Sequence, residues 1–102
     1  QIHALCWWDL IPGLWDELRE GPSVGIGHSG EMETSAILAL APHLVRRECL
    51  RVVPGISDDP ALGSVAKGER LLSAGAEALA DYLRQLASLP GREIEGVHTV
   101  MR

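Results

Sequence analysis

Three side chains that could transfer a proton fall close together in the sequence: His28, Glu31 and Glu33. They belong to the segment 27–35, where a glycine-rich stretch meets a helix-compatible pattern. The unpaired N–H groups and the dipole of that helix favour a neutral imidazole at position 28, which can accept a proton near pH 7. The same dipole stabilises carboxylates in the first turn. The pattern is therefore compatible with a proton-transfer site, but it is more typical of an ordinary helix N-terminus.

A metal site is a second interpretation of the same residues. Imidazole and carboxylate ligands together suit zinc or manganese. His28 with Glu31 or Glu33 gives two or three ligands, and no neighbour completes a recognised spacing. His3 and His43 lie in apolar or helix-end contexts, which are typical of core or surface histidines. We therefore predict no metal ligand in this chain.

Trp7, Trp8 and Trp15 contribute most of the aromatic residues, and core packing or a subunit interface is the usual role of such side chains. Trp8 has a functional alternative. At the C-terminal end of a buried parallel strand it would face the crevice where open α/β sheets bind ligands, and an indole can pack over a flat heterocycle. Asp58 and Asp59 precede a proline, which predicts a turn rather than catalysis.

The elements that position these residues follow from the spacing of apolar side chains. Residues 2–8 form a nearly continuous apolar run, which predicts a strand buried on both faces. Apolar residues recur at helical spacing in three segments, at 10–20, from 31 to about 40, and at 64–86. Gly68 and Gly75 weaken the last helix by about 1 kcal/mol each relative to Ala.

Loops separate the expected helices. Residues 21–30 are the most glycine-rich stretch and lead directly into the second helix, which Pro42 is expected to end near Leu40. Residues 56–63 are rich in Asp, Gly and Pro and predict an extended linker or lid. After Pro90 no periodicity predicts an element.

Composition excludes several classes of function. The 102 residues allow one domain at most, and a net charge of -5 with nine scattered Lys and Arg residues gives no basic surface for nucleic acid. No apolar run is long enough to span a bilayer, and the residues of this chain do not show the basic, apolar and small-residue pattern that would predict a secretory leader. Cys6 and Cys49 lie far apart, which suits a reducing cytoplasm. The apolar run directly after Gln1 leads us to expect an upstream portion outside this chain.

The segment 27–45 reads Gly-His-Ser-Gly-Glu-Met-Glu-Thr-Ser-Ala-Ile-Leu-Ala-Leu-Ala-Pro-His-Leu-Val. It resembles the creatininase-family signature His-Ala/Gly-Gly-x-x-Glu-Thr-Ser-x-x-Leu-x-Leu-x-Pro-x-Leu-Val. Asp59-Pro60 and Ala66-Lys67-Gly68-Glu69 resemble the family's Gly-Asp-Pro and Lys-Gly-Glu elements, and Trp7-Trp8-Asp9 resembles the end of a family strand. The resemblance covers about residues 4–86 and corresponds to the C-terminal part of a typical member.

This resemblance implies an α/β fold, a three-layer α/β sandwich with a mainly parallel sheet, of which residues 1–102 would be the C-terminal portion of a single domain. It implies a metal-dependent hydrolase of a cyclic or linear amide bond in a small-molecule substrate. It also implies a divalent metal pair (zinc, manganese or iron), a homo-oligomer, and an N-terminal portion on the same or another chain. A metal pair activates water, and the protein transfers a proton to the amide nitrogen.

Site residues follow from the resemblance position by position. His28 occupies the position of the proton-transferring histidine, Glu33 that of the glutamate beside it, and Trp8 that of an aromatic residue that covers the substrate. Val24, Gly25 and Gly27 replace a second Trp and acidic residues of creatinine hydrolases proper, which argues against creatinine as the substrate.

The family's metal-binding motifs, Glu-x-His…Asp and His-x-Glu, do not occur in this sequence, so the metal ligands are expected outside this chain. Two alternatives within the family are a formamide deformylase acting on a pyrimidine nucleotide and a peptidase acting on a modified peptide. A further alternative is a non-catalytic, truncated module that serves assembly.

Overall fold

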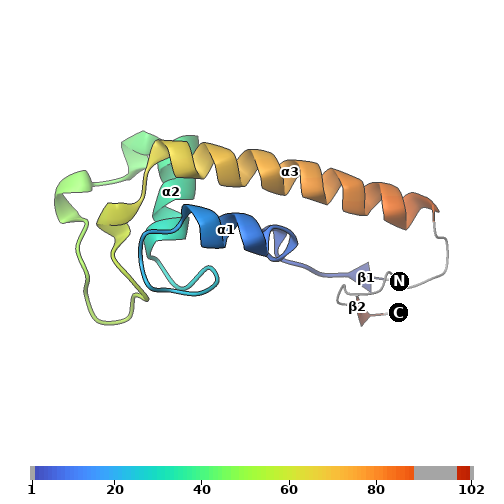
Figure 1. Cartoon of the computed structure of the whole chain (residues 1–102), viewed down its shortest axis with the longest axis horizontal. Helices are drawn as coiled ribbons and strands as arrows, with labels where there is room; N and C mark the ends of the chain where they lie inside the picture. The colour runs from blue at the N-terminus through green and yellow to red at the C-terminus, as the bar shows by residue number, and fades with distance from the viewer. Residues whose placement is uncertain (1, 89–98, 102) are drawn as a thin grey trace.

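The computed structural model describes residues 2–88 and 99–101 and is mostly helical. Its α-helices are α1 (Pro12–Leu18), α2 (Glu31–Leu40) and α3 (Val65–Ser88). Short 3-10 turns lie between them: η1 (Trp7–Leu10), η2 (Pro42–Leu44), η3 (Arg47–Cys49) and η4 (Pro60–Leu62). Helix α3 runs along most of the long axis of the molecule, α1 lies along it, and α2 stands across both at one end (Figure 1).

The predicted three-layer α/β sandwich with a mainly parallel sheet is wrong. In the described residues the strands are β1 (Ile2–His3) and β2 (Thr99–Met101), which pair antiparallel with an irregular register. The chain leaves β1 and forms the turn η1 within the segment predicted as a strand. A strand buried on both faces needs backbone partners on both sides. The described part of the chain offers it only β2, so Trp7 and Trp8 pack against helices instead.

The three predicted helices are confirmed, each within a few residues of its expected ends. Pro12 occupies the first position of α1, where its missing N–H has no helical partner to lose. Helix α2 ends at Leu40 before Pro42, which cannot continue it. Residues 21–30 form a loop, as expected. Residues 89–98, where no element was predicted, lie outside the described part of the chain.

A small hydrophobic core joins the helices. Trp15 from α1, Met32 from α2 and Leu71 from α3 are its buried members. Partly buried apolar side chains surround them, from Trp7, Trp8, Ile11, Leu14, Leu18 and Ile26. The loop 21–30 therefore contributes one apolar side chain, Ile26, to this core. Polar contacts must hold the rest of the loop.

Gly68 and Gly75, which weaken α3 as an isolated helix, are points where other elements approach it closely. A Cβ atom at Gly68 would lie 2.0 Å from the carbonyl oxygen of Ser35 in α2, and one at Gly75 would lie 2.5 Å from the ring of Trp7. The loss of helix propensity is therefore offset by close packing of α2 and η1 against α3.

Among the described residues, no helix combines the length and apolar character needed to cross a membrane.

Candidate functional site

His28 lies in the exposed loop that leads into α2. Its backbone N–H donates a 2.8 Å hydrogen bond to Oγ of Ser57, and its carbonyl oxygen accepts one of 3.0 Å from the Ser57 N–H. The imidazole lies at the surface, and it forms no hydrogen bond with any described residue. The backbone of His28 is thus fixed from both sides while its ring stays accessible.

Glycines flank His28 because the segment 57–58 approaches the loop so closely. A Cβ atom at Gly27 would lie 2.1 Å from Oγ of Ser57, and one at Gly30 would lie 1.6 Å from Oδ1 of Asp58. Gly27 also has a φ of +67°, which side-chain-bearing residues rarely adopt. The glycine spacing around His28 is therefore a requirement of this contact.

Glu33 stands in the first turn of α2, and its carboxylate accepts a hydrogen bond from the backbone N–H of Ser29. Ser29 has a left-handed backbone with a φ of 53°, and the glutamate stabilises this turn. Glu33 thus holds the residue after His28 rather than the imidazole itself.

Trp8 and Glu33, predicted separately, line the same cavity of about 260 Å³ between η1, α2 and α3. The indole of Trp8 packs edge-on against Trp7, with ring centroids 5.7 Å apart and an angle of 74° between the planes. Trp8 reaches this position from a 3-10 turn and not from a strand end. Gly27 and Ser29, the neighbours of His28, line two further cavities of about 430 and 630 Å³.

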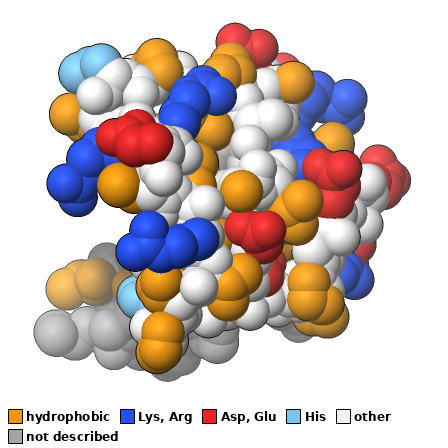
Figure 2. Space-filling view, turned by 90° about the vertical axis from the view of Figure 1, so that its left-hand side faces the viewer, with side chains coloured by type: hydrophobic (Ala, Val, Ile, Leu, Met, Phe, Trp, Pro, Cys, Tyr) orange, Lys and Arg blue, Asp and Glu red, His pale blue; other side chains and the backbone are white. Residues whose placement is uncertain are grey.

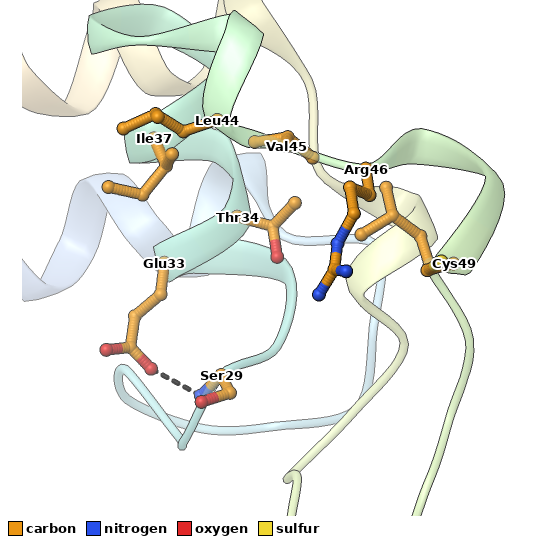
Figure 3. Close-up of a pocket in the computed structure, with 9 residues that line it drawn as sticks. Ser29, Glu33, Thr34, Ile37, Leu44, Val45, Arg46 and Cys49 are labelled. Carbon is orange, nitrogen blue, oxygen red and sulfur yellow. Dashed lines mark hydrogen bonds between the residues drawn. The ribbon is translucent and has the colours of Figure 1, made fainter.

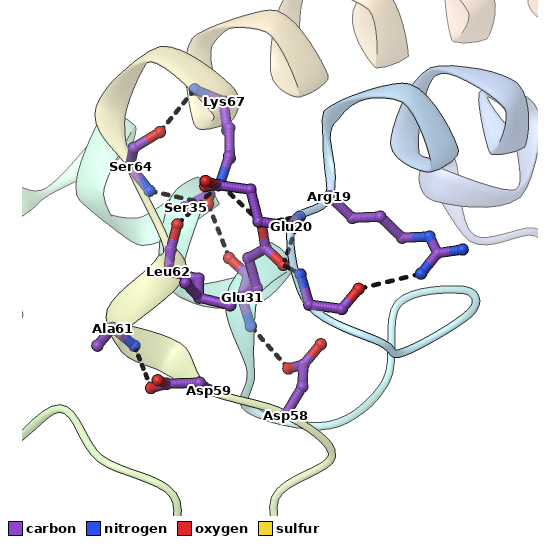
Figure 4. Close-up of polar contacts among 11 residues, drawn as sticks. Arg19, Glu20, Glu31, Ser35, Asp58, Asp59, Ala61, Leu62, Ser64 and Lys67 are labelled. Carbon is purple, nitrogen blue, oxygen red and sulfur yellow. Dashed lines mark hydrogen bonds and ion pairs between the residues drawn. The ribbon is translucent and has the colours of Figure 1, made fainter.

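Glu31 has a different role from Glu33, although both stand in the same helical turn. Its carboxylate is fully buried and accepts hydrogen bonds from the N–H of Glu20 at 2.9 Å, from that of Gly21 at 2.8 Å, and from Nζ of Lys67 at 2.7 Å (Figure 4). Lys67 also donates to the carbonyl oxygen of Leu62 at 2.9 Å and pairs with the Glu20 carboxylate. Glu31 therefore joins α2, α3 and the start of the loop.

The pKa of Glu31 is shifted by opposing causes. Burial raises it, but the hydrogen bond from Lys67, those from the backbone N–H groups and the lysine charge together bring it below its ordinary value. For Lys67 the directions are reversed: burial lowers its pKa, but the hydrogen bonds and charges of Glu20 and Glu31 together bring it above its ordinary value. Glu31 stays ionised with its oxygens occupied, so it is unsuited to exchange protons with a substrate.

The turn predicted at Asp58 and Asp59 forms at Asp59, whereas Asp58 caps the distant helix α2, which was not predicted. Asp58 is 6% exposed, and its Oδ1 accepts a 2.9 Å hydrogen bond from the N–H of Glu31 at the start of α2. Asp59 accepts one of 2.9 Å from the N–H of Ala61 and caps η4. Both contacts are drawn in Figure 4.

Two residues that position the site were not predicted. Lys67 belongs to the Lys-Gly-Glu element, and that motif was the available signal for it. Ser57 carried no signal of its own, because its role depends on a contact with a loop 29 residues away.

Within residues 2–88 and 99–101, no three or more His, Cys, Asp and Glu side chains gather as a potential metal site. The described residues therefore do not supply a ligand set for the metal pair that the resemblance implies.

No family model, curated protein or solved structure matches this chain. The likeness to the creatininase family therefore depends on the segments 27–45 and 59–69 and on the tryptophan pair.

Proposed function

We propose that this chain is the proton-transferring part of a metal-dependent hydrolase that cleaves a cyclic or linear amide bond of a small molecule. One observation carries the proposal: Trp8 and Glu33 line a single cavity beside the loop that presents His28. These are the three residues that the likeness to the creatininase family assigns to substrate contact and proton transfer. They come from segments about twenty residues apart, and the fold places Trp8 and Glu33 together.

The accessible imidazole of His28 is the group that can exchange a proton with a bound amide. Amide cleavage requires a proton on the leaving nitrogen, and a positioned general acid or base contributes about 10²–10⁴-fold to the rate. Glu33 contributes by accepting the hydrogen bond from the Ser29 N–H, which stabilises the turn next to His28.

The metal pair, zinc, manganese or iron, would activate the attacking water. Its ligands are expected outside this chain, on an N-terminal portion of the same or another chain. The chemistry that we derive from the present residues is confined to proton transfer and substrate contact.

The cavity next to Trp8 limits what part of the substrate it can hold. Its volume of about 260 Å³ lies just below the range of about 300–1,000 Å³ that is typical of whole ligand pockets. It therefore accommodates one ring-sized, largely apolar group against the indole. A modified peptide can offer such a group, whereas the ring of a formamide on a pyrimidine nucleotide is flat but polar.

The test uses the native, metal-loaded protein with any upstream portion that it carries. We expect His28→Ala to lower kcat for amide hydrolysis by about 10²–10⁴-fold, with the bound metal content unchanged. His43→Ala is the matched control, because His43 is exposed in η2 and lines none of the cavities beside the loop that carries His28, so it should leave turnover unaffected. Loss of metal, or unchanged turnover in His28→Ala, would contradict the proposal.

An assembly module is the second candidate, and exposed apolar side chains favour it. Ile37, Leu40 and Leu44, at the end of α2 and in η2, are 42%, 68% and 68% exposed. Side chains of this kind are typical of subunit contacts, and the enzyme itself is also proposed to be a homo-oligomer. Sedimentation of Leu40→Gln/Leu44→Gln tests the contact. Dissociation, together with a lack of amide hydrolysis in the native protein, would favour the module.

We further propose a cytoplasmic location and no nucleic-acid or membrane partner. Cys6 and Cys49 are both unpaired and exposed, and free thiols of this kind persist in reducing compartments. Fractionation of cells that produce the native protein tests this location.

A further inference from the structure

A cavity of about 630 Å³ lies between α2 and the segment 44–50, directly beside the loop that carries His28 (Figure 3). Ser29, Glu33 and Thr34 line it from the site, and Arg46 lines it from the opposite segment. Its volume falls within the range of about 300–1,000 Å³ that is typical of sites for small molecules. The cavity is shallow and open to solvent, and it is large enough for the part of a substrate that extends beyond the smaller cavity at Trp8.

The charges in this cavity are separated. Among the described residues that line it, Arg46 is the one cation and Glu33 the one carboxylate. The Glu33 carboxylate is occupied by the N–H of Ser29, and no ion pair joins Arg46 to an acidic side chain in the described part of the chain. In Figure 3 the guanidinium of Arg46 points back towards α2, and Thr34 lies between it and Glu33.

The positive charge of this cavity is local. Figure 2 faces this end of the molecule and shows basic side chains interspersed with acidic and hydrophobic ones. The whole chain carries a net charge of -5, so a general attraction for anions is not expected. Any preference for an anion in the cavity must therefore come from Arg46 itself.

We propose that Arg46 determines substrate specificity by binding an anionic group, a carboxylate or a phosphate, on the amide substrate. This inference rests on the proposed hydrolase function. The planar guanidinium binds either anion through two parallel hydrogen bonds, and it stays charged at all physiological pH values. The hydroxyl group of Thr34 lies between the two charged residues and can donate a further hydrogen bond. The amide then lies towards Ser29 and His28, and the anion lies towards the segment 44–50.

The kinetic test compares two substrates that differ only in charge, N-formylglycine and N-formylglycinamide, with the native metal-loaded protein. Arg46→Gln should raise KM for the carboxylate about tenfold to hundredfold, since a charge-assisted pair is lost. Its kcat, and both constants for the neutral amide, should stay unchanged. Arg46→Lys should recover only part of the loss, because an ammonium cannot form the paired hydrogen bonds. Arg47→Gln is the matched control, since Arg47 is exposed and does not line the cavity.

A binding test separates this inference from the proposed function. N-acetylglycine and inorganic phosphate are titrated separately into ¹⁵N-labelled native protein, and the Arg46 Nε–H and Thr34 N–H signals are followed by NMR. Saturable shifts of the Thr34 N–H signal that disappear in Arg46→Gln, together with shifts of both signals that persist in Arg47→Gln, support the anion site, even if no amide is hydrolysed. The anion that binds more tightly identifies the substrate as a carboxylate or a phosphate. Equal shifts in Arg46→Gln and Arg47→Gln, or no shift with either anion, would overturn the inference. Neither result would contradict the proposed role of His28 in amide hydrolysis.

Discussion

The ammonium of Lys67, in the first turns of α3, lies 2.7 Å from the carboxylate of Glu31, which is fully buried at the start of α2. The same carboxylate holds the N–H groups of Glu20 and Gly21, where the loop to His28 begins. One ion pair thus fixes two helices and one end of the loop. The other end is held by Ser57 and Asp58, so the loop is anchored on both sides of its accessible histidine.

Lys67→Met is expected to lower the free energy of unfolding by about 3–5 kcal/mol, because it leaves the Glu31 carboxylate buried without its charge partner. Lys67→Met/Glu31→Gln should recover part of this loss, since the uncompensated charge is removed. Urea denaturation followed by circular dichroism measures both. Arg84→Met is the control, because the pair of Arg84 with Asp81 on α3 is exposed and is worth about 0–1 kcal/mol. Equal losses in Lys67→Met and Arg84→Met would show that the buried pair contributes little.

The same pair predicts how stability depends on pH. The pKa of Glu31 is lowered in the folded state, so its contribution is present above the ordinary value of 4.5 and is lost as the pH falls through the folded value. The pKa of Lys67 is raised, so its contribution is present below 10.5 and is lost as the pH rises through the folded value. We expect an acid and an alkaline decline in the urea midpoint, and both should be shallower in Lys67→Met/Glu31→Gln. A variant with the unchanged pH profile would contradict this.

The helices could be predicted because their signals are local. The apolar stripe of α3 repeats over many turns, and prolines mark the start of α1 and the end of α2. The strand predicted over residues 2–8 was wrong because an apolar run indicates that side chains are buried but does not indicate which backbone they pair with. The described chain offers β1 one short antiparallel partner, and the tryptophans turn into a helical core instead. The parallel sheet was carried over from a family likeness and had no counterpart in the spacing of later residues.

The site was predictable only in part for the same reason. Glu31 and Glu33 have the same local signal, and only the distant Lys67 and Gly21 decide that Glu31 is buried and structural. Trp8 was expected at the end of a strand and lies in a 3-10 turn instead, where it lines a cavity of about 260 Å³. No sequence pattern pointed to Arg46, because its proposed role depends on its position across a cavity from Glu33.

Gly68→Ala should destabilise the protein although alanine is the better helix former. The added Cβ would lie 2.0 Å from the backbone carbonyl of Ser35, so α2 and α3 would have to separate. We expect a loss of about 1–3 kcal/mol, typical of overpacking. Gly13→Ala in α1 is the matched control, because no atom lies within 4 Å of its added Cβ. It should be neutral or stabilising by up to about 1 kcal/mol. Thermal unfolding of both variants distinguishes packing from helix propensity as the cause.

Ser57→Ala tests whether the backbone contact at His28 matters for function. The substitution removes the acceptor of the His28 N–H but keeps the hydrogen bond from the Ser57 N–H, so the loss of stability should be about 1 kcal/mol. If the contact positions the imidazole, kcat for amide hydrolysis should fall at least tenfold while KM changes little, because a small displacement of a catalytic group has a large effect on rate.

Hydrogen exchange at the His28 amide, measured by NMR, should accelerate in Ser57→Ala because this N–H loses its partner. Ser73→Ala, on the exposed face of α3, is the control for a serine substitution without such a contact and should change neither exchange nor kcat. Faster exchange with unchanged kcat in Ser57→Ala would show that the loop tolerates displacement. The contact of Ser57 with the backbone of His28 would then serve stability alone.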